Sequence, residues 1–351
     1  MSGCDPSASL GRARLLRRRG IRGVAAALCV AACATVALES VVHASPASAP
    51  DGSRTVAVTA LGGGQFDVTV YSAAMDRPIT LWVLHSGGES GPSPTLYLLN
   101  GVDGGENGGS WTGRSDVASF FADKNVTVVV PLAGRASYYT DWERDDPVLG
   151  RNKWTTFLTG ELPPLIDNIF HNLGRNAIAG LSMSTTSVLN LAIHSPGLYQ
   201  AVGSYSGCAR TSDPLAQVYV SSQLAGFGAD ARNMWGPPSG PAWSENDPTL
   251  HADRLRGTEL YIAAGTGLPG PHESLSAPGI DSNIGALADR AIVGGGMEAV
   301  VNQCTSQMVD RLQALRIPAT VNLRPAGTHS WPYWQDDLHA SWPMFAAATG
   351  A

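Results

Sequence analysis

The chain has 351 residues, 23 basic and 29 acidic side chains, a formal charge of -6, and 44% hydrophobic residues. This length allows one large domain with a substantial core. An acidic chain has no electrostatic reason to bind nucleic acid or an anionic membrane, so we expect no nucleic-acid partner.

The first 44 residues have the composition of an export signal. Six arginines between positions 12 and 22 precede an apolar run at residues 24–38, and Val42-His43-Ala44 resembles a signal peptidase site. The run is shorter than the roughly 20 residues of a membrane-spanning helix. We therefore expect residues 1–44 to be removed and residues 45–351 to form one domain, secreted or in the cell envelope. Two variants stay open: Arg18-Arg19 in a twin-arginine signal, or Cys33 as a lipid anchor.

The mature chain opens with runs typical of strands. Residues 55–58, 66–70 and 79–84 are β-branched or alternating and are separated by turn residues, which predicts an antiparallel start to a sheet. Near-continuous apolar runs follow at 95–99 and 126–130, with a helix predicted at 115–122 between them. Buried runs that alternate with helices indicate parallel strands covered on both faces.

The second half continues this alternation. We predict a helix over 155–172, a strand leading to Ser182, further strands at 201–205, 259–264 and 319–323, and a helix over 298–315. Residues 208–256, rich in Gly, Pro and Trp, are interpreted as a surface excursion over the active site. The order predicts an α/β fold with a mostly parallel central sheet and helices on both faces. With the serine turn and the two loops described next, it predicts an α/β-hydrolase fold.

A nucleophile elbow is predicted where an apolar run ends at Gly180-Leu181-Ser182-Met183-Ser184. The serine of such a strand-to-helix turn takes a strained conformation, so the residues two before and two after it must be small. Ser184 stands where glycine is usual, which weakens the match. The following helix N-terminus would stabilise negative charge on a substrate. The alternative is an ordinary loop serine.

The oxyanion hole and the general base are expected on two other loops. A glycine-rich loop at residues 100–105 follows a buried strand, which favours the backbone N–H groups of Val102 and Met183 as oxyanion donors. The alternative is a flexible surface loop. His329 follows the last predicted strand, the position from which an imidazole can reach the elbow. His194 and His339 lack this context.

The acid of the triad should lie between Ser182 and His329 in chain order. Spacing does not choose among four candidates: Glu273, Asp281, Asp289 and Glu298. Because no His or carboxylate pattern has metal-ligand spacing, we expect no metal and no cofactor.

Three of the five cysteines lie in the signal segment, at positions 4, 29 and 33. Cys208 and Cys304 remain in the mature chain. Two cysteines in an exported protein suggest one disulfide.

Four further motifs are highly specific as a set: Tyr-Thr-Asp-Trp at 139–142, Trp-Gly-Pro at 235–237, Asn-Asp-Pro at 246–248 and His-Ser-Trp-Pro-Tyr-Trp at 329–334. Segments 96–101, 153–158 and 180–184 add to them. Together, in this order and over roughly residues 95–345, they resemble the antigen 85 mycolyltransferase family.

This resemblance implies a catalytic triad. Ser182 would be the nucleophile and His329 the base, and Met297-Glu298-Ala299 matches the family's Leu-Glu-Gly, so Glu298 is favoured as the acid. The enzyme would move a mycolyl group from trehalose monomycolate to trehalose or cell-wall arabinan through an acyl-serine. The rival hypotheses are a secreted carboxylesterase and a non-catalytic envelope or matrix-binding protein, since family members are described as binding fibronectin.

The substrate contacts implied by the resemblance are less direct. The family binds trehalose through an Asp-Gly-Leu-Arg loop, and this chain has Asn100 and Asp103 at its two polar positions, so we expect a different acceptor preference. Trp235, with Trp243, either stacks on a sugar ring or packs its own loop, and Trp331 is a further candidate contact. The Asn-Gly form and the positions of Cys208 and Cys304 look more like the corynomycolate branch.

Overall fold

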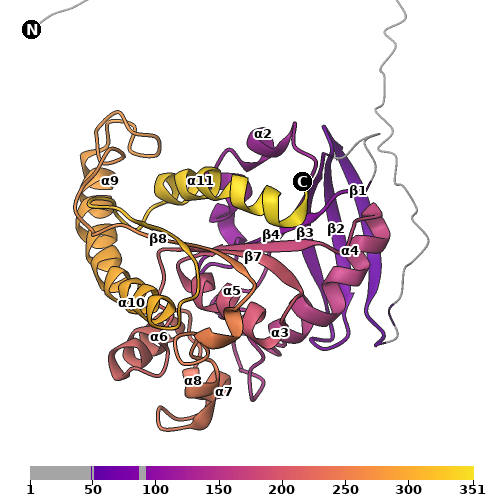
Figure 1. Ribbon diagram of the computed structural model, residues 1–351, viewed down its shortest axis with the longest axis horizontal. Coiled ribbons are helices and arrows are strands. Elements are labelled where there is room, and N and C mark those ends of the chain that lie inside the picture. Colours follow the sequence, from indigo (N-terminus) through magenta and orange to yellow (C-terminus); the bar gives the residue numbers. More distant parts are fainter. Residues whose placement is uncertain (1–48, 50, 87–91) are drawn as a thin grey trace, which may run out of the picture. The chain divides into compact units, whose positions relative to one another are not determined.

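The computed structural model describes residues 49, 51–86 and 92–351 (Figure 1). The predicted export signal and Cys33 lie outside the described residues. A nine-stranded sheet in the order β1-β2-β3-β5-β4-β6-β7-β8-β9 runs through the described residues. Its strands are β1 Arg54–Gly62, β2 Gln65–Ser72, β3 Arg77–His85, β4 Thr95–Leu99, β5 Thr127–Pro131, β6 Asn176–Leu181, β7 Tyr199–Tyr205, β8 Glu259–Ala264 and β9 Thr320–Leu323.

The predicted mostly parallel sheet is confirmed. Strands β1, β2, β3 and β5 pair antiparallel, and the pairs from β5 through β4 to β9 are parallel. The strands predicted from apolar and alternating runs are present, although β1 and β2 extend further than their predicted runs. The carboxyl ends of β4 and β6 to β9 therefore share one edge of the sheet, where ligands of such folds bind.

Helices cover both faces of the sheet. In Figure 1, α2 and α11 lie on one side of it and α3, α4 and α5 on the other. The helices are α1 Trp111–Arg114, α2 Val117–Phe121, α3 Trp154–Thr156, α4 Leu162–Phe170, α5 Met183–His194, α6 Pro214–Gly226, α7 Ala231–Trp235, α8 Pro241–Glu245, α9 Ile284–Asp289, α10 Gly295–Ala314 and α11 Trp331–Thr349. Further segments of 3₁₀ or π type are η2 Glu106–Gly108, η3 Phe157–Glu161, η4 Ala252–Leu255 and η5 Arg290–Gly294. None of the described helices is long and apolar enough to cross a membrane.

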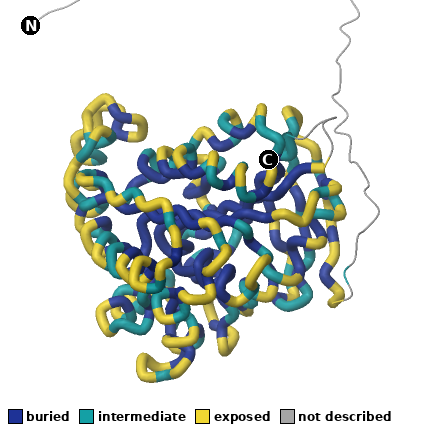
Figure 2. Tube along the Cα trace, in the orientation of Figure 1, coloured by how far each residue is buried: buried dark blue, intermediate teal, exposed yellow. Residues whose placement is uncertain are grey.

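Two hydrophobic cores result, one on each face. Successive side chains of a strand point to opposite faces, and β4 shows this directly: Leu96 and Leu98 belong to the core under α11, whereas Tyr97 and Leu99 belong to the core that contains α4 and α5. All five residues of β4 are buried. Figure 2 shows the central strands buried along their length, as expected for strands covered on both faces.

The excursion at residues 208–256 contains more helix than we predicted. Helices α6, α7 and α8 and segment η4 lie within it. The carboxylates of Asp213 and Asp230 accept hydrogen bonds from the backbone N–H groups of Leu215 and Arg232 and so cap α6 and α7. Pro214 is the first residue of α6. An Asp-Pro pair is a helix-start signal, so the start of α6 could have been predicted from the sequence.

Candidate active site

Ser182 lies at a sharp turn between β6 and α5, as an elbow requires. Its φ and ψ are 52° and -119°, a strained conformation for a residue with a side chain. The two elements approach closely, because a Cβ on Gly180 would lie 2.5 Å from the Ser184 hydroxyl oxygen. A Cβ on Gly207 would lie 2.4 Å from the Ser182 carbonyl oxygen. Glycine at both positions lets the backbone hold Ser182 in this conformation.

Ser184 has a structural role that explains why it can replace the usual glycine. Its hydroxyl oxygen accepts a hydrogen bond from the Leu181 N–H at 2.9 Å. The same hydroxyl lies 3.0 Å from the Leu181 carbonyl and 3.2 Å from the Leu99 carbonyl, either of which can accept its proton. These contacts tie the turn after β6 to the end of β4. A buried hydroxyl with donor and acceptor both satisfied carries little desolvation penalty.

His329 lies next to Ser182 although 147 residues separate them in the chain. The distance from His329 Nε2 to Ser182 Oγ is 2.8 Å. The His329 N–H donates to the Gly294 carbonyl at 3.0 Å, and the imidazole packs edge-on against Trp334. The loop after β9 is therefore held by a backbone hydrogen bond and by the packing of the His329 imidazole.

Glu298 completes a continuous chain of hydrogen bonds. Its Oε2 lies 2.9 Å from His329 Nδ1, and its Oε1 accepts from Ser206 Oγ at 2.7 Å and from the Gly265 N–H at 2.6 Å. The side chain is 0% exposed. Because a carboxylate only accepts, Nδ1 carries the imidazole proton and Nε2 is left to accept the Ser182 proton.

The structure separates the four acidic candidates. Glu298 alone contacts His329. Glu273 contacts the neighbour of His329 in the chain rather than His329 itself. Its carboxylate accepts hydrogen bonds from Thr328 Oγ1 at 2.8 Å and from the Tyr333 hydroxyl at 2.6 Å. Asp281 and Asp289 are exposed. Ser206 and Gly265 were not predicted, and their only sequence signal is that each directly follows a predicted strand.

The Val102 and Met183 N–H groups have no acceptor among the described residues. Met183 is the first residue of α5, directly after Ser182. The Val102 carbonyl accepts from the Ala136 N–H at 2.7 Å, which anchors the loop. A Cβ on Gly101 would lie 3.9 Å from the Ser182 Cβ, so this loop passes close to the elbow. Both amides are free to bind a developing oxyanion, and their role stays a prediction.

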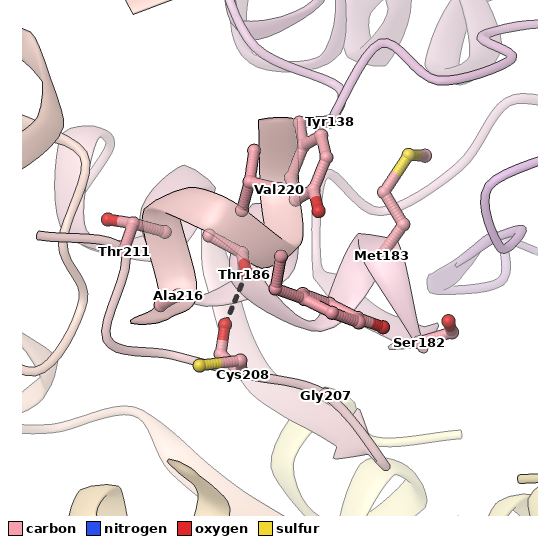
Figure 3. A pocket seen from close by; sticks show the side chains of 10 residues that line it. Tyr138, Ser182, Met183, Thr186, Gly207, Cys208, Thr211, Ala216 and Val220 are labelled. Atoms are coloured by element: carbon pink, nitrogen blue, oxygen red, sulfur yellow. Dashed lines mark hydrogen bonds between the residues drawn. The ribbon is translucent and has the colours of Figure 1, made fainter. Parts of the chain in front are cut away.

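A narrow, mainly apolar pocket adjoins Ser182 (Figure 3). Its free volume is about 10 Å³, roughly the space of one water molecule. Ala216 and Val220 of helix α6 line it together with Tyr138 and Met183. The predicted excursion therefore covers part of the site through α6.

Asn100 does not have the substrate-facing position we expected. It is fully buried, and its Nδ2 donates to the Pro131 carbonyl at 2.8 Å while its Oδ1 accepts from the Trp111 N–H at 3.0 Å. The side chain joins β5, α1 and the oxyanion loop, so the expected sugar contact is wrong. Asp103 is half-buried and lies against Gly109 of its own loop, and burial raises the pKa of its carboxyl. Its substrate role stays a prediction.

The proposed stacking face at Trp235 is also wrong. Trp235 is 1% exposed and packs edge-on against Tyr138 and Trp243, with ring centroids 5.9 and 5.2 Å apart. The alternative, that these tryptophans pack their own loop, is the observed one. Trp331 is half-buried between Trp111 and Trp334, and its contact with substrate stays a prediction.

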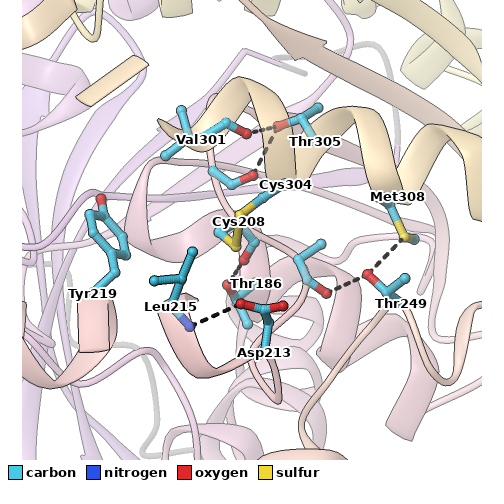
Figure 4. The surroundings of a disulfide bond; sticks show 12 residues. Thr186, Cys208, Asp213, Leu215, Tyr219, Thr249, Val301, Cys304, Thr305 and Met308 are labelled. Atoms are coloured by element: carbon cyan, nitrogen blue, oxygen red, sulfur yellow. Dashed lines mark hydrogen bonds between the residues drawn. A yellow bond between two sulfur atoms is a disulfide. The ribbon is translucent and has the colours of Figure 1, made fainter. Parts of the chain in front are cut away.

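The predicted disulfide between Cys208 and Cys304 is confirmed (Figure 4). It joins the segment after β7 to α10, the helix that carries Glu298. The Thr186 hydroxyl of α5 donates to the Cys208 carbonyl at 2.6 Å. The Thr305 hydroxyl of α10 lies 3.0 Å from the Gly207 carbonyl and can donate to it. Helices α5 and α10 are thereby held on either side of the same short segment.

The sheet order, the strained serine turn and the hydrogen-bonded serine, histidine and glutamate define a protein of the α/β-hydrolase class. The family model described as "Putative esterase" matches residues 72–345. The mycolyltransferase named diacylglycerol acyltransferase/mycolyltransferase Ag85B from Mycobacterium avium is 32% identical over 300 residues, which cover 80% of this chain and 82% of that protein. The corresponding Ag85A from Mycobacterium tuberculosis is 31% identical over 298 residues, or 80% of each chain.

Two solved structures support the fold. MPT51 (FbpC1) of Mycobacterium tuberculosis aligns with a TM-score of 0.64 and 23% identity over 79% of this chain and 96% of that chain. An S-formylglutathione hydrolase from Agrobacterium tumefaciens aligns with a TM-score of 0.59 and 15% identity over 84% of this chain and 99% of that chain. The chain therefore belongs to the putative esterase family, among the relatives of the antigen 85 mycolyltransferases, as the motifs predicted.

Replacing Cys208 and Cys304 together by serine should lower the free energy of unfolding by about 2–5 kcal/mol, because the bond closes a long loop in the unfolded chain. Urea unfolding of the oxidised protein, the reduced protein and the double variant measures this effect. The reduced protein and the double variant should agree with each other. Equal stability of all three forms would contradict a bracing role for the bond.

Proposed function

We propose that this protein is an exported acyltransferase that moves a mycolyl group from a trehalose monoester to a sugar hydroxyl through an acyl-Ser182 intermediate. The observation that carries the proposal is the hydrogen-bond chain from Ser182 through His329 to Glu298. It occurs in a chain 31–32% identical to proteins named mycolyltransferases. The export signal predicted at residues 1–44 is consistent with a substrate in the cell envelope.

The proposed first half-reaction forms the acyl-enzyme. Ser182 Oγ attacks the ester carbonyl carbon while its proton passes to His329 Nε2. The negative charge that develops on the carbonyl oxygen is stabilised by the N–H groups of Val102 and Met183 and by the N-terminus of α5. Collapse of this intermediate breaks the ester C–O bond, and the departing sugar oxygen takes the proton from the imidazolium.

The second half-reaction repeats these steps with an acceptor hydroxyl. His329 removes the acceptor proton, the acceptor oxygen attacks the acyl carbonyl, and Ser182 Oγ leaves and recovers its proton. The buried Glu298 carboxylate stabilises the imidazolium in both halves. Transfer exceeds hydrolysis only if a bound acceptor is aligned and water is largely excluded.

The pocket beside Ser182 supports an acyl donor. Its walls are mainly apolar, and burial raises the pKa of the Tyr138 phenol well above its ordinary value, so this wall stays uncharged. Since the free volume is only about 10 Å³, we expect a long acyl chain to require movement of α6. The disulfide at Cys208 holds the segment before α6, so such movement would occur beyond that anchor.

Ser182→Ala should abolish turnover without unfolding the protein, because alanine removes the nucleophilic oxygen and adds no bulk at the turn. Losing one triad member costs on the order of 10⁴-fold or more in rate. The rate of ester cleavage and labelling by a fluorophosphonate probe measure this effect. Wild-type protein should take up one probe molecule and the variant none. A folded wild-type protein that takes up no probe would favour the non-catalytic binding hypothesis.

Glu298→Gln should also reduce the rate strongly, because a neutral amide cannot stabilise the imidazolium of His329. Asp281→Asn, at an exposed carboxylate in the same chain interval, is the matched control and should be nearly silent. Steady-state rates of both folded variants give the ranking. If the asparagine variant lost more activity than the glutamine variant, the acid would be misassigned.

A further inference from the structure

A second cleft lies at the same edge of the sheet as Ser182, and the proposed reaction steps do not use it. Its volume is about 320 Å³, and it is lined by the start of β3, the loop after β5, the turn at residues 146–152 and Glu106 of η2. Leu81 of β3 pairs with Pro131 at the carboxyl end of β5, so the start of β3 projects past that edge. Strands β3 and β6 are three spacings apart, roughly 14 Å.

Two arginines line this cleft with incompletely paired guanidinium groups. The Nε–H groups of Arg77 and Arg135 are buried and have no acceptor among the described residues. The remaining polar contacts of Arg77 are long, 3.5 Å from Nη1 to the Leu149 carbonyl and 3.7 Å from Nη2 to the Met75 sulfur. The carboxylate of Glu106 lies 3.9 Å from Arg135 Nε. The lining thus carries two cations and one anion.

This arrangement is costly for Arg77 unless an anion binds, whereas the Arg135 side chain is 38% exposed and lies near the Glu106 carboxylate. Burial lowers the pKa of the Arg77 guanidinium, yet arginine stays charged at neutral pH. A buried N–H of a cation without an acceptor loses its hydration and gains no partner. A phosphate or carboxylate supplies several acceptor oxygens in the planar geometry that a guanidinium matches. The volume is at the lower end of that of small-molecule sites.

The cleft is connected to the oxyanion loop by close backbone packing. Glu106 follows Val102 on the same loop, and a Cβ on Gly104 would lie 2.3 Å from the backbone nitrogen of Arg135. The N–H of Ala136, next to Arg135, donates to the Val102 carbonyl. A ligand between Arg77 and Arg135 would therefore sit directly behind the loop that presents the Val102 N–H to Ser182.

We propose that this cleft binds an oxyanion carried by the acyl acceptor, a phosphate or carboxylate on a sugar of at least two rings whose hydroxyl reaches Ser182. The inference rests on the proposed acyl transfer for its acceptor role. It assigns Arg77 and Arg135 as the residues that hold the anionic group. It also gives a physical reason why a neutral disaccharide need not be the preferred acceptor of this chain.

The test is calorimetric titration of the Ser182→Ala protein, in which no turnover occurs, at low salt. The ligands are trehalose 6-phosphate, a glucuronate-containing disaccharide, trehalose and inorganic phosphate. We expect at least one charged sugar to bind about tenfold or more tightly than trehalose, a difference that one charge-assisted hydrogen bond can supply. High salt should weaken this binding. Which charged sugar binds identifies the group as phosphate or carboxylate.

Arg77→Gln and Arg135→Gln should each lower the affinity for the charged sugar by about tenfold, because each removes a guanidinium partner. Arg135 lies on a loop and its side chain is 38% exposed, so its variant stays informative if Arg77→Gln unfolds in a thermal scan. Arg232→Gln, at an exposed arginine paired with Asp230, is the control and should bind normally.

Three results would overturn the proposal: equal binding of charged and neutral sugars, full affinity in both arginine variants, or inorganic phosphate binding as tightly as the sugar phosphate. Ester cleavage by the wild-type protein is measured separately. If the protein bound a charged sugar but cleaved no ester, the proposed function and the acceptor role would both be wrong. The oxyanion site in the cleft would still be supported.

Discussion

The buried carboxylate of Glu298 accepts hydrogen bonds from Ser206, Gly265 and His329, and the orientation of the imidazole depends on them. Ser206 and Gly265 directly follow β7 and β8, so two neighbouring strand ends fix one side of the carboxylate. The backbone and ring contacts of His329 fix the other side. Because every donor comes from a different element, the site exists only when the carboxyl edge of the sheet is assembled.

The same edge explains how strain at the nucleophile is tolerated. Ser182 has a φ of 52°, and a residue held this way needs surroundings that determine its conformation. Gly180, Ser184 and Gly207 provide them through close backbone contacts and a satisfied hydroxyl. The disulfide adds a second constraint, since it fastens α10, and with it Glu298, to the segment after β7.

Much of the fold could be predicted because buried strands leave long apolar runs between helices. The elbow pattern indicated Ser182, and the position after the last predicted strand indicated His329. The acid could not be chosen by spacing, since four carboxylates satisfy the order and only contact distinguishes Glu298. Trp235 and Asn100 were misplaced for a related reason. A tryptophan in a Gly- and Pro-rich segment, or an asparagine after a strand, can face a ligand or the protein interior, and sequence does not record which.

The proposed transferase activity requires that the acyl-serine pass its acyl group to a sugar in preference to water. The most direct measurement is product analysis of single turnovers of the wild-type protein with trehalose monomycolate, with and without saturating neutral or charged acceptors. We expect the acyl ester of an acceptor to replace free acid as the main product when that acceptor is present. Free acid as the dominant product with every acceptor would identify an esterase and rule out acyl transfer.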